Sequence, residues 1–182
     1  MGDIVRQRGF TLMELLITVV IIGILAGIGV PALRDLVLSN RQVAAVNELV
    51  TALQMARSHA ITRGQGRDVY TNADPAAVVC PSADGATCGG TWADGWIIFW
   101  DANGDNAPAD SDGGVLRAFE APPGPTIGGG PTRLRFGRDG RLDGAAAFTF
   151  CDDRGDAHGR RVDIGLLGRP GVSKVAAGTC GG

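Results

Sequence analysis

One acidic side chain, Glu14, lies inside a long apolar segment near the N-terminus. From Phe10 to Val30 the other residues are apolar, apart from Thr11 and Thr18. A carboxylate inside hydrocarbon costs roughly 2.5–3.5 kcal/mol on membrane-insertion scales. We therefore expect Glu14 to have a cationic partner. The alternative is a peripheral charge that extends to the lipid–water interface.

A second group of oxygen-bearing side chains follows an apolar segment in the middle of the chain. Asp101, Asn103 and Asp105 stand at alternating positions, like the first ligands of a calcium loop, and Asp110 and Asp112 follow. The pattern departs from an EF-hand because its sixth position is not glycine and its twelfth is not glutamate. A calcium-stabilised, membrane-anchored module is one hypothesis. The alternative is a solvated turn rich in Asn, Asp and Gly.

Positive charge is concentrated toward the C-terminus. The formal net charge of −2 argues against a general affinity for polyanions. Residues 68–120 nevertheless carry nine acidic residues and one basic residue, whereas residues 133–174 carry nine basic and six acidic ones. Four of the basic residues are candidates for contact with the phosphate backbone of double-stranded DNA: Arg160, Arg161, Arg169 and Lys174. The alternative is that they are surface charges interleaved with aspartates.

Catalytic chemistry finds little support in the sequence. The two histidines, His59 and His158, belong to no recognisable Ser/His/Asp or Cys/His motif. We therefore predict a non-enzymatic protein without a cofactor, with calcium as the one candidate ion.

The elements that position these residues begin with a long helix. Residues 10–30 rise about 31 Å as a helix, close to the bilayer hydrocarbon thickness of about 30 Å. The preceding Arg6 and Arg8 predict a cytoplasmic N-terminus and export of the remainder. A cleaved secretory signal peptide is the alternative, but no small-residue cleavage site with a polar mature start follows the apolar run. Residues 31–63 instead continue as an amphipathic helix that ends near Arg63 and Gly64.

Residues 64–182 are predicted to form an exported, β-rich head. Short alternating segments here are separated by glycine-rich turns. Residues 96–100 are nearly all apolar, which predicts a central strand buried on both faces. The expected strands are 68–71, 77–80, 96–101, 115–121, 132–136, 147–151, 160–167 and 173–177. The predicted class is α+β, with antiparallel sheet packed against the exported half of the helix.

Four cysteines lie in this exported segment. No CxxC motif is present and histidine is scarce, which favours disulfides in an oxidising compartment over a zinc site. Four cysteines allow three pairings, and proximity in sequence favours Cys80 with Cys88 and Cys151 with Cys180.

The N-terminal motif RGFTLME, residues 8–14, resembles the class III signal of type IV pilins and type II secretion pseudopilins. The resemblance implies that a prepilin peptidase removes residues 1–9 by cleavage after Gly9 and methylates the new N-terminus at Phe10. Glu14 is then the fifth mature residue and Pro31 the twenty-second, as in the family. Both are implied assembly residues, and Glu14 is expected to pair with the Phe10 α-amine of its own or a neighbouring subunit.

The same resemblance implies a pilin fold, a helical spine with a β head. It also implies the partners: other pilin or pseudopilin subunits, the prepilin peptidase, the inner-membrane assembly platform and inner-membrane lipid. The expected location is the bacterial inner membrane as a single-pass protein with its head in the periplasm, and then the pilus or pseudopilus.

Three downstream segments narrow the resemblance. CPSADG at 80–85, GWIIFWD at 95–101 and Gly168-Arg169 resemble the GspH/FimT group of minor pilins and pseudopilins. Some FimT-type members act in DNA uptake through a C-terminal Gly-Arg-x-Arg segment. Here residues 168–171 read GRPG, so the second arginine is missing. The resemblance implies a minor filament subunit of a type IV pilus or a type II secretion pseudopilus. A DNA-binding minor pilin for natural transformation is the alternative.

Overall fold

The computed structural model describes residues 10–64, 75–109, 113–120 and 123–180. The chain divides into two compact units between Leu38 and Ser39. The predicted strand at 68–71 lies outside the described residues, as do Gly9, Asp110 and Asp112.

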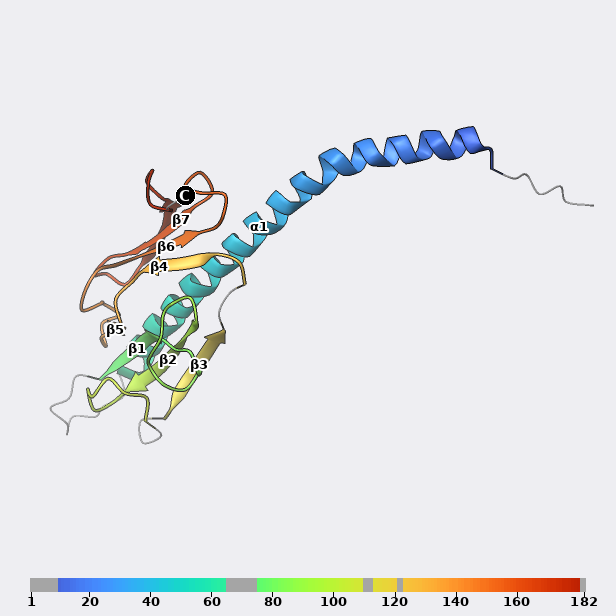
Figure 1. Cartoon of the computed structure of the whole chain (residues 1–182). Helices are drawn as coiled ribbons and strands as arrows, with labels where there is room; N and C mark the ends of the chain where they lie inside the picture. The colour runs from blue at the N-terminus through green and yellow to red at the C-terminus, as the bar shows by residue number, and fades with distance from the viewer. Residues whose placement is uncertain (1–9, 65–74, 110–112, 121–122, 181–182) are drawn as a thin grey trace, which may run out of the picture. The chain divides into compact units, whose positions relative to one another are not determined.

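One α-helix, α1, runs from Leu12 to Gly64 (Figure 1). Thr11 caps its start, because the Thr11 Oγ1 atom accepts a hydrogen bond from the backbone N–H of Glu14 at 3.2 Å. Arg63 lies in the last turn and Gly64 ends the helix. The predicted helix and its C-terminal boundary are confirmed.

In the first unit the helix is apolar, and its residues 12–37 are exposed. The most apolar window of α1 has a mean hydropathy of 2.6, none of it is buried, and the helix is long and apolar enough to cross a membrane. Phe10 is 82% exposed and Ile28 is 71% exposed. Such a surface requires a lipid or protein partner.

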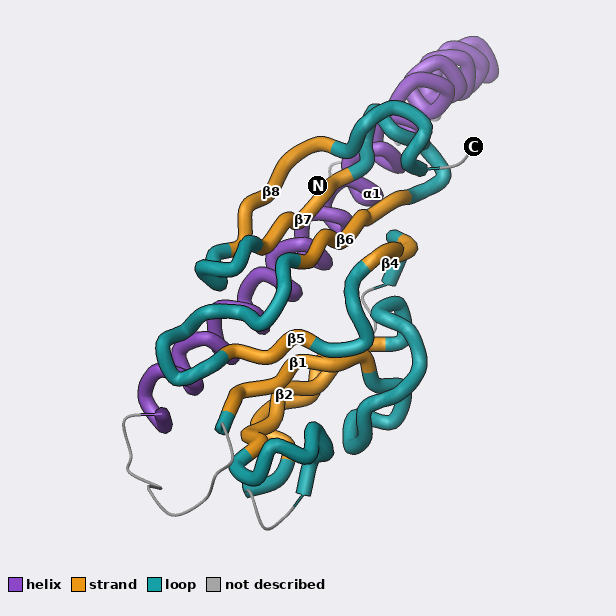
Figure 2. Tube along the Cα trace, turned by 90° about the vertical axis from the view of Figure 1, so that its left-hand side faces the viewer, coloured by secondary structure: helices purple, strands orange, loops and turns teal. Residues whose placement is uncertain are grey.

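The second unit carries two four-stranded antiparallel sheets. The first has the order β3-β2-β1-β5, formed by Val115–Glu120, Gly95–Asp101, Ala76–Pro81 and Leu134–Phe136. The second has the order β4-β6-β7-β8, formed by Thr126–Gly129, Ala146–Cys151, Arg160–Ile164 and Pro170–Lys174. The two sheets lie one after the other along α1 (Figure 2).

The main core lies between α1 and the inner faces of both sheets. The helix contributes a stripe of small and branched residues that includes Leu49, Ala52 and Leu53, each fully buried. The first sheet adds Trp96 and the second adds Phe148 to the same cluster. Burial of aromatic and aliphatic area on this scale is the main favourable free energy of the head.

The predicted central strand is confirmed as β2, in which every residue is buried. Its inner face joins the main core. Its other face packs Ile97 and Phe99 against Val78 and Cys80 of β1 in a second, smaller cluster. The chain from Ser82 onward returns close to β1, because Cys80 is bonded to Cys88.

Both expected disulfides form. Cys80 is bonded to Cys88 and Cys151 to Cys180, and the described residues contain no free cysteine. The second bridge joins the end of β6 to the C-terminal segment. The pairing inferred from proximity is confirmed.

Candidate functional site

The first turn of α1 fixes the position of Glu14. Residues 11–14 read Thr-Leu-Met-Glu, the S/T-x-x-E pattern of a capping box. In the structure Thr11 accepts the N–H of Glu14, so Glu14 lies one turn after Phe10. Because the Cα–Cβ bond of a helical residue is tilted toward the N-terminus of the helix, the Glu14 side chain leaves the backbone in the direction of Phe10. Sequence reasoning overlooked Thr11, although the capping-box pattern identifies it.

Pro31 lies inside α1 and cannot donate a hydrogen bond to the carbonyl of Gly27, four residues earlier. An added Cβ atom at Gly27 or Gly29 would meet no other atom within 4 Å. The backbone is therefore open to close approach by another helix around this position.

Asp101, at the end of β2, forms an ion pair with Arg135. The Asp101 side chain is fully buried, and its Oδ2 atom lies 2.9 Å from Nη1 of Arg135. The backbone N–H groups of Gly104 and Asn106 also donate to its carboxylate, at 2.7 and 3.2 Å. The oxygens predicted to bind calcium are thus occupied by protein donors.

The other two candidate calcium ligands bond to each other. Nδ2 of Asn103 donates to Asp105 at 2.9 Å, and the N–H of Asp105 donates back to Asn103 at 3.0 Å. Ala107 donates its N–H to Asp105, and this bond is the main cause of the lowered pKa of the Asp105 carboxyl. Among the described residues, no three His, Cys, Asp or Glu side chains gather to hold a metal ion. The arrangement is that of a hydrogen-bonded turn.

The four candidate DNA-binding residues separate into three places. Arg160 and Lys174 are directly opposite in the β7–β8 pair and line a cavity of about 290 Å³ together with His158. Arg161 alternates to the other face of β7, where its Nε atom pairs with Asp163 at 2.8 Å. Arg169 lies in the turn between β7 and β8, beyond the Ile164–Pro170 pair, whereas Arg160 and Lys174 form the pair at the opposite end of the two strands.

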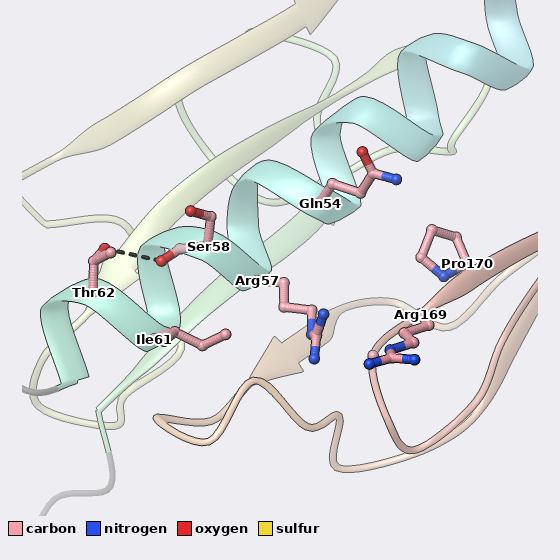
Figure 3. A pocket seen from close by; sticks show the side chains of 8 residues that line it. Gln54, Arg57, Ser58, Ile61, Thr62, Arg169 and Pro170 are labelled. Atoms are coloured by element: carbon pink, nitrogen blue, oxygen red, sulfur yellow. Dashed lines mark hydrogen bonds between the residues drawn. The ribbon is translucent and has the colours of Figure 1, made fainter.

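Arg169 is accompanied by an arginine of α1 that sequence reasoning did not single out as a site residue. Arg57 of α1 and Arg169 line the same cavity of about 500 Å³, and Figure 3 shows both side chains reaching into it. No local sequence pattern predicts that Arg57 and Arg169 share a cavity, because the two residues lie far apart in the sequence. Its formation depends on how the β7–β8 turn packs against α1.

The histidines show no catalytic arrangement in the part of the chain that the structure describes. His59 is half-buried on α1, and His158 lines the Arg160 cavity in a loop. The N–H of His158 donates to the carbonyl of Gly155, which closes a turn.

An apolar helix that precedes a disulfide-bonded β-rich head in the sequence is the arrangement of pilin-like subunits. Comparison with known proteins places the chain in the same class. A model of the family described as type II transport protein GspH matches residues 45–168, more than half of the chain. A model of the prokaryotic N-terminal methylation motif matches residues 4–30. The chain therefore belongs to the GspH family, whose members are minor pilins and pseudopilins, structural subunits without enzymatic activity.

Individual relatives are pilus proteins. A fimbrial protein of Pseudomonas aeruginosa is 44% identical over 69 residues, which are 38% of this chain and 43% of that protein. The type IV narrow pilus major component PilA5 of Thermus thermophilus is 38% identical over 87 residues, which are 48% of this chain and 70% of that protein. The chain thus spans less than half the length of the fimbrial protein that it matches.

A solved structure shares the fold. The type IV minor pilin FimU of Pseudomonas aeruginosa superimposes with a TM-score of 0.55 at 22% identity, over 78% of this chain and 96% of that one. The predicted pilin fold is confirmed by this likeness, which concerns the fold alone.

Proposed function

We propose that the chain is a minor pilin that is cleaved after Gly9, methylated at Phe10 and assembled into a type IV pilus through its apolar helix. The observation that carries the proposal is the apolar half of α1, which begins with a capped turn at Glu14 and is left exposed by the described residues. A protein keeps such a helix exposed only for lipid or for other helices.

Glu14 is proposed to pair with the α-amine that cleavage creates at Phe10 of a neighbouring subunit. In hydrocarbon an ionised carboxylate is costly unless a cation neutralises it. The pair forms only when two helices are in register along their axes, so the charge selects the correct register as well as contributing attraction.

The proposed location and partners follow from this chemistry. Before assembly the helix lies in the inner membrane, with the head in the periplasm, where its two disulfides form. The prepilin peptidase and the assembly platform would act on it there, followed by the other subunits of the filament. A type II secretion pseudopilus uses the same helix chemistry. The pilus is favoured because the relatives are pilus proteins.

Replacement of Glu14 tests the proposal. Glu14→Gln removes the charge but keeps the backbone N–H that Thr11 accepts. We expect cleavage and methylation at Phe10 to persist while the amount of subunit in sheared filaments falls at least about tenfold, which corresponds to 1.4 kcal/mol. Mass spectrometry of the mature N-terminus and immunoblots of the filament and membrane fractions measure the two effects.

Thr11→Val is the matched control, because it removes the cap and keeps the acid. It should leave assembly near the normal level. Normal incorporation of the Glu14→Gln protein would refute the pairing. An equal loss in both variants would mean that assembly is sensitive to any change in the first turn of α1, and would not support a specific role for the Glu14 charge.

DNA binding is a second candidate, favoured by Arg160 and Lys174. Like charges directly opposite on neighbouring strands repel, and these two pair with no carboxylate in the described part of the chain. A phosphate group in the cavity that they share with His158 would relieve this repulsion.

A salt titration of duplex-DNA binding by the detergent-solubilised protein tests this candidate. The affinity should fall steeply with salt and fall further in an Arg160→Ala/Lys174→Ala double variant. Arg141→Ala, at an exposed arginine on another turn, is the control. Absence of binding at low salt would remove this candidate and leave the filament role intact.

A further inference from the structure

We propose that Arg57 and Arg169 form a receptor for a carboxylate that a neighbouring filament subunit presents on its head. The inference rests on the proposed function, because it requires a neighbour in a filament. It adds a specific contact between heads to the assembly through the apolar helix.

Arg57 is held in place by the protein and keeps hydrogen-bonding capacity for a ligand. Its Nε atom donates to the carbonyl of Gly140 at 3.0 Å, which orients the guanidinium. The two Nη groups carry the remaining four of the five N–H donors of an arginine. The side chain is half-buried, so much of the entropy cost of ordering it is already met in the free protein.

Gly168 allows the β7–β8 turn to approach this arginine. It has a φ of +68°, and a Cβ atom there would lie 2.3 Å from the Gly140 carbonyl oxygen and 3.3 Å from Cδ of Arg57. Only glycine fits both the backbone conformation and the space. The next residue, Arg169, therefore enters the cavity from the wall opposite Arg57 (Figure 3).

The cavity carries two positive charges without an internal counterion. None of its described lining residues is acidic. Neither guanidinium pairs with a carboxylate within the described ranges. Two guanidinium groups in one cavity repel each other, and a bound anion would convert the repulsion into two charge-assisted contacts. The exposed Ser58 hydroxyl on the same wall is a further donor.

The remaining lining favours a carboxylate on a protein side chain over a nucleic acid. Ile61 and Pro170 give the cavity apolar walls that suit the methylene groups of Asp or Glu. A phosphate backbone requires a row of cations, whereas the next candidate pair, Arg160 and Lys174, lies at the other end of the β7–β8 hairpin.

Heads of this kind present suitable carboxylates, as this chain itself shows. Asp84 and Asp94 are exposed in the segment between β1 and β2, and among the described residues they accept hydrogen bonds only from neutral N–H and hydroxyl groups. Hydrogen bonds from Thr87 hold the pKa of Asp84 well below its usual range, and those from Thr91 lower the pKa of Asp94. Both remain charged at neutral pH and have no cationic partner in the described part of the chain, so their charge is complementary to that of the Arg57–Arg169 cavity.

Photo-crosslinking in cells that assemble filaments tests the proposal. A photo-reactive amino acid replaces Gln54, an exposed residue on the cavity wall, in the full chain. We expect a crosslink to a pilin-class subunit at a peptide that contains an exposed Asp or Glu. Arg169→Glu should reduce this product at least about tenfold. In the Arg169→Glu protein, replacing the mapped acidic residue of the neighbouring subunit by Arg should restore the crosslinked product. Arg133→Glu, at an exposed arginine outside the cavity, should leave it unchanged.

Three outcomes would overturn the inference. They are a crosslink to DNA or lipid, a subunit crosslink that Arg169→Glu leaves unchanged, and the lack of any crosslink while the subunit is present in filaments. Absence of the subunit from filaments would instead defeat the proposed function. Immunoblots of the sheared filaments distinguish these cases, and intact disulfides in Arg169→Glu verify that its head has folded.

Discussion

Nη1 of Arg135 lies 2.9 Å from Oδ2 of the fully buried Asp101, so that one ion pair connects β5 to β2 across the intervening strand β1. The same Nη1 atom donates to Oδ1 of Asn106, and Asn106 donates its N–H to Asp101. Arg135, Asp101 and the turn at Asn106 therefore form one hydrogen-bonded network. This network occupies the place where the sequence suggested a calcium ion.

Loss of Arg135 should destabilise the head strongly. Arg135→Ala leaves a buried carboxylate without its cation, a change that typically costs about 3–5 kcal/mol. Urea denaturation of the detergent-solubilised chain measures the free energy of unfolding. Arg133→Ala, two residues away and exposed, should change it by no more than about 0.5 kcal/mol. Equal effects of the two substitutions would contradict a stabilising role for the ion pair.

Chelation should leave the thermal stability unchanged. The carboxylate of Asp101 already has an arginine and two backbone donors, so calcium would have to displace them. We expect the same melting temperature, by circular dichroism, with excess EDTA and with millimolar calcium. A melting temperature that rises with calcium and falls with the chelator would restore the calcium hypothesis.

Gly168→Ala should lower stability and disturb the Arg57 cavity. The new methyl group would collide with the Gly140 carbonyl oxygen, and alanine disfavours a φ of +68°. We expect a loss of about 1–3 kcal/mol. Gly165→Ala is the matched control in the same turn, because a Cβ atom there meets nothing within 4 Å. Comparable stability of the two variants in denaturant would show that the close approach at Gly168 is not needed.

The two disulfides should contribute unequally. Their sequence separations are 29 residues for Cys151–Cys180 and 8 for Cys80–Cys88. In the chain-entropy treatment these closures stabilise by about 3.6 and about 2.5 kcal/mol. Each bridge has one buried member, so the packing losses of the paired alanine variants are comparable. We expect the Cys151→Ala/Cys180→Ala protein to be less stable by about 1 kcal/mol in urea. If the Cys80→Ala/Cys88→Ala protein were the less stable of the two, local packing and not loop length would determine the contribution of each disulfide.

Sequence patterns predicted those elements whose signals are local and strong. The helix has a long apolar run followed by three- and four-residue periodicity, and β2 has five adjacent bulky apolar residues. The strand β4 was missed because Thr126–Gly129 contains two glycines and one apolar side chain, and among the described strands it pairs only with β6. The division into two sheets follows from which strands pair, and that depends on long-range packing.

The candidate sites likewise divide into those that a local sequence motif identifies and those that depend on the tertiary fold. Gly9, Phe10, Glu14 and Pro31 follow from a linear motif. The ion pair of Arg135 with Asp101 and the shared cavity of Arg57 and Arg169 join distant segments whose meeting depends on the tertiary fold. Spacing alone also grouped Arg161 with Arg160, although alternation along β7 places them on opposite faces.

Acid should weaken the attachment of the C-terminal segment through Asp156. Its carboxylate accepts the backbone N–H of Cys180 at 2.6 Å and that of Gly178, and these bonds lower its pKa below the ordinary value of 3.8. A lowered pKa in the folded state means that the contribution is complete above the ordinary value and is lost as the pH falls through the lowered one. Asp156→Asn should therefore be less stable than the parent protein by a constant amount between pH 5 and pH 7. The difference should shrink below about pH 4. Urea denaturation across this range measures it, with Asp163→Asn in an exposed ion pair as the control of small effect. A difference that grows toward acid would mean that the carboxylate of Asp156 does not hold the C-terminal segment.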